Sequence, residues 1–154
     1  MATMQSSPID NPNHPDPIQD AQFYAGVPSR RFFAWVVDTV IVGIAAFLVG
    51  IASFGIGLIL FPLTLLLMSV VYRTWTIGNA SATWGMQLMG IELRDQRGHR
   101  FDARTALWHT LLYSVCIAFF VLQVVSIVMM LGSRRSQGLP DVLLDTVAIN
   151  RPLH

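Results

Sequence analysis

A run of 41 residues from Phe32 to Tyr72 carries a single charge, Asp38, and constrains the fold more than any other feature of the chain. A helix needs about 20 apolar residues to cross a bilayer, so the run is long enough for two crossings. Three glycines and a serine within 50–57 weaken a helix and favour a tight turn there. We therefore expect two membrane spans, at about 31–51 and 55–74.

A second uncharged run extends from Thr105 to Ser133. Its 29 residues are too few for two full crossings, so we expect one tilted or over-long helix at about 107–131. The predicted fold is an all-α integral membrane bundle of three transmembrane helices. A third helix that is bent or re-entrant is the alternative.

Composition agrees with a membrane protein, because 53% of the residues are hydrophobic, only 12% are charged and the mean hydropathy is +0.54. Soluble domains carry about 25% charged residues. The net charge of +1 gives no reason to expect a nucleic-acid partner. Cys116 is the one cysteine, which excludes a disulfide within the chain.

Residues 1–28 differ from the rest, being rich in proline, asparagine, aspartate and serine without an apolar period. Such a segment cannot bury enough apolar surface to offset its ordering entropy, so we expect a disordered N-terminal tail. It lacks the basic region and apolar core of a signal peptide. The predicted transmembrane domain then covers 29–150.

The arginines indicate how the spans are oriented. With three spans, the N-terminus and a loop at 75–106 lie on one side, which would carry Arg30, Arg31, Arg73, Arg94, Arg97, Arg100 and Arg104. The positive-inside rule makes that side cytoplasmic. Arg134, Arg135 and Arg151, in the C-terminal segment 134–154, would then lie on the far side. All ten arginines share one side only if the third segment doubles back.

The loop contains a short β pattern. Ile91 and Leu93 alternate with Glu92 and Arg94, and the residues that follow, from Asp95 to Gly98, suit a type I turn. We expect a short cytoplasmic β-hairpin here.

Asp38 is costly within a span, because an ionised aspartate near the helix centre costs about 2.5–3.5 kcal/mol. Arg31 lies seven residues earlier, about 10 Å away along a helix axis, which is too far for a close ion pair. Asp38 therefore needs a partner from another segment, or must be protonated. It either fixes helix packing through hydrogen bonds, or it titrates or contacts a ligand.

Small residues near Asp38 predict a helix contact on its face, since Ala34, Ala45 and Ala52 follow helical spacing with it. In the third apolar run His109, Cys116 and Gln123 recur every seven residues and form a weakly polar seam. We expect the two seams to meet, with His109 and Gln123 as candidate partners of Asp38. Ordinary packing between helices is the competing interpretation of this seam.

Three blocks of the sequence resemble the RDD family of small bacterial membrane proteins: "RFFAWVVD" at 31–38, "SATWGMQLMGIELRDQRG" at 81–98 and "GLPDVLLDTVAI" at 138–149. The resemblance assigns the signature arginine to Arg31 and the two signature aspartates to Asp38 and Asp141. Thr83, Gly85 and Gly90 match the glycine-containing middle block. Family members usually have a lysine at Met86, a histidine at Pro140, and alanine and glycine at Leu144 and Asp145.

The signature residues suggest a joint arrangement. If Asp141 folds back beneath the bundle, Arg31 can bridge it through a charge-assisted hydrogen bond, with Asp38 deeper in the membrane. This arrangement needs the C-terminal segment on the cytoplasmic side, which favours a third segment that returns.

Enzymatic motifs are missing from the sequence: it has no phosphate-binding glycine loop and no nucleophile elbow. His14, His99, His109 and His154 are too scattered for metal-ligand spacing. We expect neither an enzyme nor a cofactor. The resemblance implies an inner-membrane protein of a bacterium, with ion or small-solute transport as its activity and Asp38 as the intramembrane site. The alternative is a non-transporting accessory or scaffold subunit of a larger complex, and partners beyond the lipid bilayer would be copies of the chain or that complex.

Overall fold

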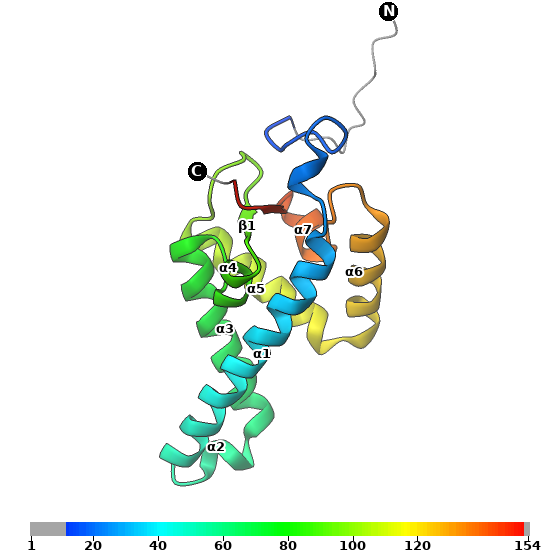
Figure 1. Cartoon of the computed structure of the whole chain (residues 1–154). Helices are drawn as coiled ribbons and strands as arrows, with labels where there is room; N and C mark the ends of the chain where they lie inside the picture. The colour runs from blue at the N-terminus through cyan, green and yellow to red at the C-terminus, as the bar shows by residue number, and fades with distance from the viewer. Residues whose placement is uncertain (1–11, 153–154) are drawn as a thin grey trace, which may run out of the picture.

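The computed structural model describes residues 12–152 (Figure 1), and within them helices dominate. In chain order the elements are η1 (Ala21–Phe23), α1 (Val27–Ala52), α2 (Ile56–Ile59), α3 (Phe61–Ala80), α4 (Trp84–Leu88), β1 (Ile91–Arg94), α5 (Ala103–Ala118), α6 (Phe120–Gly132), α7 (Leu139–Leu144) and β2 (Val147–Asn150).

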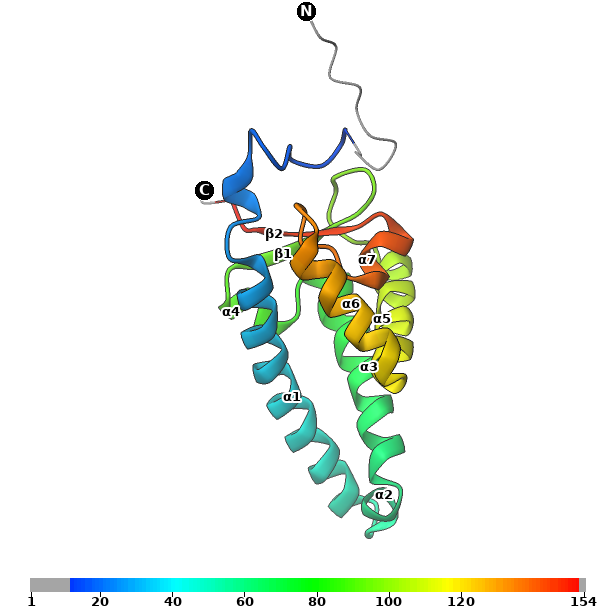
Figure 2. The same cartoon turned by 90° about the vertical axis from the view of Figure 1, so that its right-hand side faces the viewer.

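The two long helices α1 and α3 form a hairpin that the short helix α2 closes (Figure 2). The turn uses Gly55 with φ of 88°, a conformation that favours glycine. Gly57 packs against Gly50 so closely that a Cβ on Gly57 would lie 2.9 Å from the Cα of Gly50. The predicted break within 50–57 is therefore confirmed. Pro62 lies in the first turn of α3, where its missing N–H has no cost.

One helix in the described part of the chain is long and apolar enough to cross a membrane, Ala21–Ala52, which joins η1 to α1. Helices α5 and α6 pass the same criterion only as a pair, bent by 115° at the break between them. The prediction of a single helix over 107–131 is wrong, and the broken alternative is what forms. Phe119 has an extended backbone at the break, and α6 returns toward the end of the molecule where α5 begins (Figure 1). The predicted bundle of three complete spans is not shown.

The strand prediction is correct in part. Gly98 N–H donates to the carbonyl of Asp95 over 2.9 Å, so the expected turn forms. The partner of β1, however, is β2, antiparallel, with Ile91 opposite Asn150 and Arg94 opposite Val147. The predicted β-hairpin is wrong because the chain after the turn proceeds to α5, whose first turn is capped by Asp102.

The N-terminal segment differs from the expected disordered tail. Over 12–28 it forms turns, η1 and the start of α1. His14 Nε2 lies 2.7 Å from the carbonyl oxygen of Asp95, and Asn150 Nδ2 donates to the carbonyl of Gln22 over 2.8 Å. Tyr24 is buried beside β2. Residues 1–11 lie outside the described residues, so the tail prediction stands untested there.

The hydrophobic core lies at one end of the α1–α3 hairpin, where α1, α3, α4, α5 and the sheet meet. Its members are Val27, Ala34, Ile77, Ala82, Met86, Ile91, Leu93, Phe101, Ala106 and Ala148. The α1 N-terminus, the β1–α5 loop and the segment after α6 gather at this end (Figure 2). These segments, together with the last residue of β1, the first turn of α5 and the residue after β2, carry every arginine except Arg73. The other end, beyond the reach of α5 and α6, exposes large apolar side chains of the kind that face lipid.

Candidate functional site: two buried carboxylates and an interhelical cleft

Asp38 lies on α1 and is 3% exposed. Its Oδ1 accepts hydrogen bonds from the Tyr72 hydroxyl at 2.7 Å and from the backbone N–H of Gly85 at 2.9 Å. Its Oδ2 accepts a hydrogen bond from the Thr83 hydroxyl at 2.6 Å. Three donors from α3 and the α4 segment therefore satisfy the buried carboxylate, which is what a polar group away from water requires.

The segment that begins α4 is shaped to reach Asp38. Thr83 is the N-cap of α4, and its hydroxyl accepts a hydrogen bond from the backbone N–H of Met86 while it donates to Asp38. A Cβ on Gly85 would lie 2.3 Å from the carbonyl oxygen of Ala34 and 2.8 Å from Asp38 Oδ1. Only glycine allows α4 to lie this close to α1.

Arg73 is the cation nearest to Asp38, with its NH1 3.7 Å from Oδ2. This distance makes an ion pair but exceeds that of a hydrogen bond. The guanidinium lies over the ring of Tyr113 on α5, 3.9 Å from the ring centroid, in cation–π geometry. Arg73 thus connects the Asp38 site on α1 to α5.

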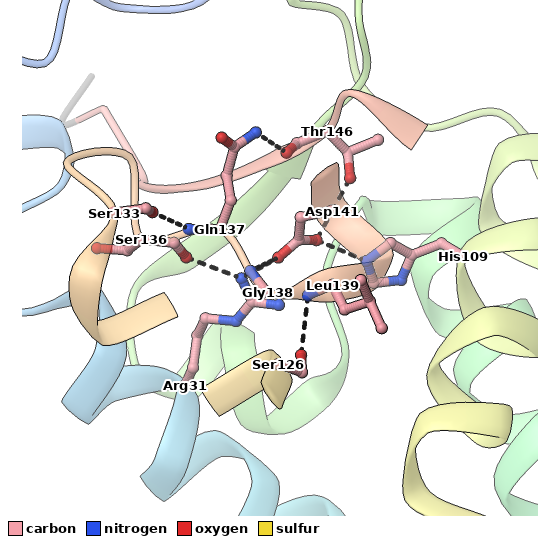
Figure 3. Close-up of polar contacts among 10 residues, drawn as sticks. All are labelled: Arg31, His109, Ser126, Ser133, Ser136, Gln137, Gly138, Leu139, Asp141 and Thr146. Carbon is pink, nitrogen blue, oxygen red and sulfur yellow. Dashed lines mark hydrogen bonds and ion pairs between the residues drawn. The ribbon is translucent and has the colours of Figure 1, made fainter. Parts of the chain in front are cut away.

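The second carboxylate, Asp141 on α7, is completely buried. Figure 3 shows Arg31 and His109 pointing at it from two sides: Arg31 NH1 donates to Oδ2 at 2.5 Å, and His109 Nε2 lies 2.8 Å from Oδ1. The backbone N–H of Gly138 and the hydroxyl of Thr146 donate to the same carboxylate at 3.1 and 3.3 Å. Asp141 therefore joins α1, α5, α7 and the start of β2.

The electrostatics of Asp141 follow from these contacts. Burial alone would raise the pKa of Asp141, but the Arg31 guanidinium and His109 hold that pKa well below its usual value. The carboxylate is therefore charged at neutral pH, and its bond with Arg31 is the charge-assisted kind.

The chain before Asp141 is held against α6. Ser126 Oγ accepts a hydrogen bond from the backbone N–H of Leu139 at 2.9 Å (Figure 3). A Cβ on Gly138 would lie 2.7 Å from that hydroxyl oxygen, so glycine permits the close approach. This contact holds α6 beside α7.

A cleft of about 750 Å³ opens beside both carboxylates. Its lining contains Arg31, Asp38, Arg73 and His109, here called the floor, and the rest of the lining, here called the walls, is mostly apolar. The other lining residues come largely from α1, α5 and α6: Pro28, Ser29, Phe32, Phe33, Trp35, Met86, Tyr113, Cys116, Gln123, Ser126, Ile127, Met130, Leu131, Gly138 and Pro140. A cleft of this size that combines a few polar groups with apolar walls is typical of small-molecule sites.

Residues 25–145 match the family model of the RDD family. The chain belongs to the RDD family. No curated protein and no solved structure matches it.

Two of the three signature residues of this RDD protein meet, in the arrangement that the resemblance suggested: Arg31 bonds Asp141. Asp38 belongs to a separate cluster with Arg73, one that sequence reasoning missed. The signal was present, since Arg73 directly follows the long uncharged run.

The two predicted seams do not meet as expected. His109 contacts Asp141 rather than Asp38, and Gln123 lies beyond the break, on α6, where it lines the cleft. Cys116 is buried on α5. A seven-residue repeat has no common face once the helix bends by 115°.

The buried stripe of α1 also differs in spacing. Ala34 and Asp38 are buried as expected, but the stripe continues through Val42, Ala46 and Gly50, and neither Ala45 nor Ala52 is buried. A spacing of four follows the ridge of side chains along which helices commonly pack.

A third buried carboxylate, Glu92 on β1, was also missed, because polar residues of an alternating strand pattern usually face solvent. It is 0% exposed and forms ion pairs with Arg94, with Arg100 at 3.7 Å and with Arg151 at 3.6 Å. These pairs tie together the loop before α5 and both strands.

Proposed function

We propose that this RDD protein binds a small amphipathic molecule in the cleft between α1, α5 and α6. The observation that carries the proposal is the combination of charged groups on the floor, Arg31, Asp38 and Arg73, with apolar walls in one cavity. A ligand with one polar end and an apolar body matches both parts. The protein acts by binding, and we propose no catalytic step.

We infer that the arginine-rich end faces the cytoplasm, in the inner membrane of a bacterium, because basic segments stay on the cytoplasmic side. The exposed apolar surfaces of α1, α3 and α6 then face the hydrocarbon of the bilayer, and the wall of the cleft lies within reach of lipid. In this orientation the ligand enters from the membrane.

Arg31 and Asp141 are proposed to shape the site rather than to bind the ligand directly. Their charges neutralise one another at 2.5 Å, and their bond holds α7 against α1. Asp38 has a comparable part, since its three hydrogen bonds hold α4 against α1.

Ion or small-solute transport with Asp38 as the working carboxylate is the second candidate. Its support is that Asp38, a membrane-level carboxylate, lines the cleft. Reconstituted protein exposed to a proton or sodium gradient tests it. Flux that disappears in Asp38→Asn supports transport through this residue, and an absence of flux in the parent protein removes the candidate.

Ligand binding is tested by native mass spectrometry of the full chain extracted in a mild detergent. Met130→Trp adds bulk to the cleft from α6 and leaves every charged residue in place, and Val128→Trp adds the same bulk on α6 at a position that does not line the cleft. We expect a stoichiometric bound molecule in the parent and in Val128→Trp, and its loss in Met130→Trp. A bound molecule that survives Met130→Trp contradicts the proposal.

The accessory or scaffold alternative predicts another result from the same preparation. A protein subunit, present in a fixed ratio to the chain, would then accompany it in mild detergent. Recovery as a lone species with a bound small molecule favours the binding proposal.

A further inference from the structure

We propose that the polar end of the ligand is an anion bound by Arg73, so that the occupant of the cleft is an anionic phospholipid of the surrounding bilayer. This inference rests on the proposed function and names the class of molecule that the cleft accepts.

Arg73 has binding capacity that the fold does not use. It is 5% exposed and lines the cleft, and its Nε is buried without a hydrogen-bond partner in the described part of the chain. Its NH1 approaches Asp38 only to 3.7 Å. Most buried donors have partners, so a buried guanidinium with an unused donor beside a cavity indicates a group that arrives from outside the fold.

Asp38 does not accept a hydrogen bond from the N–H groups of Arg73. Its oxygens already accept hydrogen bonds from Tyr72, Thr83 and Gly85 at 2.7, 2.6 and 2.9 Å. The carboxylate is satisfied without a hydrogen bond from Arg73. The cation–π contact with Tyr113 holds the guanidinium plane in place without occupying its N–H groups.

His109 adds a second unused nitrogen on the same floor. The residue is 1% exposed, its Nε2 is engaged with Asp141, and its Nδ1 is buried without a hydrogen-bond partner among the described residues. Arg31 is already neutralised by Asp141, and Arg73 faces Asp38 at 3.7 Å, so the charges of these four residues balance. Arg73 differs from Arg31 in keeping a buried N–H donor without a hydrogen-bond partner among the described residues, and this donor is the one that an anion would bind.

A phosphate suits this floor. Arginine presents planar N–H groups that bind phosphate oxygens in pairs, and the bond is strong because both partners are charged. The low dielectric of the site strengthens it further.

The walls suit an acyl chain. Phe32, Phe33 and Trp35 on α1 line the cleft together with Ile127 and Met130 on α6, and the aromatic residues of α1 are also exposed at the outer surface. The wall is thus continuous with the surface that faces lipid. A bilayer phospholipid can place its phosphate at Arg73 and leave its chains along α1 and α6.

The test is a native mass spectrometry titration of the delipidated full chain with dioleoyl phosphatidylglycerol and with dioleoyl phosphatidylcholine, which share chains but differ in net charge. We expect at least about tenfold tighter retention of phosphatidylglycerol, because phosphatidylcholine carries the same phosphate but adds a choline cation that the buried Arg73 repels at low dielectric. Arg73→Gln should bring the two lipids to equal retention. Arg97→Gln, which removes an exposed arginine outside the cleft, should preserve the preference.

A second variant, which leaves the charged residues unchanged, is needed because Arg73→Gln could misfold. Met130→Trp should lose phosphatidylglycerol while Val128→Trp retains it. Equal retention of the two lipids by the parent chain overturns the inference, as does a preference that persists in Arg73→Gln. Inorganic phosphate should not displace the lipid at equal concentration. Displacement would contradict the proposal that the acyl chains contribute to binding.

The outcomes separate this inference from the proposed function. If both lipids bind equally and Met130→Trp removes both, the cleft binds an amphipathic molecule and only the anionic character is wrong. If Met130→Trp removes neither, the binding function itself is wrong.

Discussion

The guanidinium of Arg31 lies 2.5 Å from the carboxylate of Asp141, although 110 positions separate the two residues in the sequence. This bond closes the chain on itself, because Arg31 lies in the second turn of α1 and Asp141 lies near the end of the described chain. It requires α6 to return toward the N-terminal end of α1. The broken α5–α6 pair and the signature bond are thus two aspects of one arrangement.

Replacement of Asp141 by asparagine should be strongly destabilising. Asp141→Asn preserves shape but leaves Arg31 and His109 facing a neutral amide, and loss of one partner of a buried ion pair costs about 3–5 kcal/mol. Thermal unfolding in detergent, followed by tryptophan fluorescence, measures the effect. Asp20→Asn, at a partly exposed turn, should change stability by less than about 0.5 kcal/mol. Equal midpoints for the two variants would contradict a structural role for the bond.

The same carboxylate predicts an acid-dependent loss of stability. Because the pKa of Asp141 in the folded protein lies below the value of about 3.9 expected in the unfolded chain, its contribution is complete above about pH 4. The contribution is lost as pH falls from there through the folded pKa. We expect the difference in unfolding temperature between the parent and Asp141→Asn to be constant between about pH 5 and 7 and to shrink below about pH 4. A difference that grows on acidification would refute the assignment.

A side chain at Gly85 should separate α4 from α1. In Gly85→Ala the new Cβ would meet the carbonyl oxygen of Ala34 at 2.3 Å, so we expect a loss of about 1–3 kcal/mol from overpacking. Gly43→Ala is the matched control, since a Cβ at this position of α1 meets nothing within 4 Å. It should leave the unfolding midpoint unchanged or raise it slightly, because alanine is the better helix former. Comparable losses in both variants would show that the contact is not tight.

The stability of the fold should depend on the hydroxyl group of Thr83 rather than on the shape of its side chain. Thr83→Val removes both the donor to Asp38 and the acceptor of the Met86 N–H, leaving a buried carboxylate with one donor fewer. We expect a loss of about 1–3 kcal/mol. Thr83→Ser keeps the hydroxyl and should retain most of the stability. Unfolding midpoints that rank Val above Ser would exclude the proposed hydrogen bonds.

Much of this arrangement can be predicted from local sequence. The run from Phe32 to Tyr72 and its internal glycines predict the α1–α3 hairpin, because apolar length and turn chemistry act within a short stretch of chain. The pairing of Arg31 with Asp141 came from the family resemblance instead, and the cost of burying either charge alone agrees with it.

Other features depend on distant parts of the chain. The strand β1 pairs with β2 rather than with the residues after its turn, and strand pairing between remote segments leaves little trace in either one. The apolar run 105–133 predicts an apolar environment but not the direction of the chain within it. A bent third segment was therefore only the alternative prediction, and the position of its break beside Phe119 was not predicted. Gln123 was assigned to a seam that ends at this break.

The returning α5–α6 pair predicts the sidedness of three positions. Single cysteines are placed at Arg97 in the turn after β1, at Arg134 after α6, and at Phe54, which is fully exposed where α1 ends, all in a Cys116→Ala background. Because α6 returns the chain to the end that holds the β1 turn, positions 97 and 134 should react with a membrane-impermeant maleimide from the same face (Figure 1). Position 54 should react from the opposite face. A third helix that crossed the membrane in one piece would place position 134 with position 54, and that pattern of labelling would refute both the return of α6 and the Arg31–Asp141 bond, which depends on it.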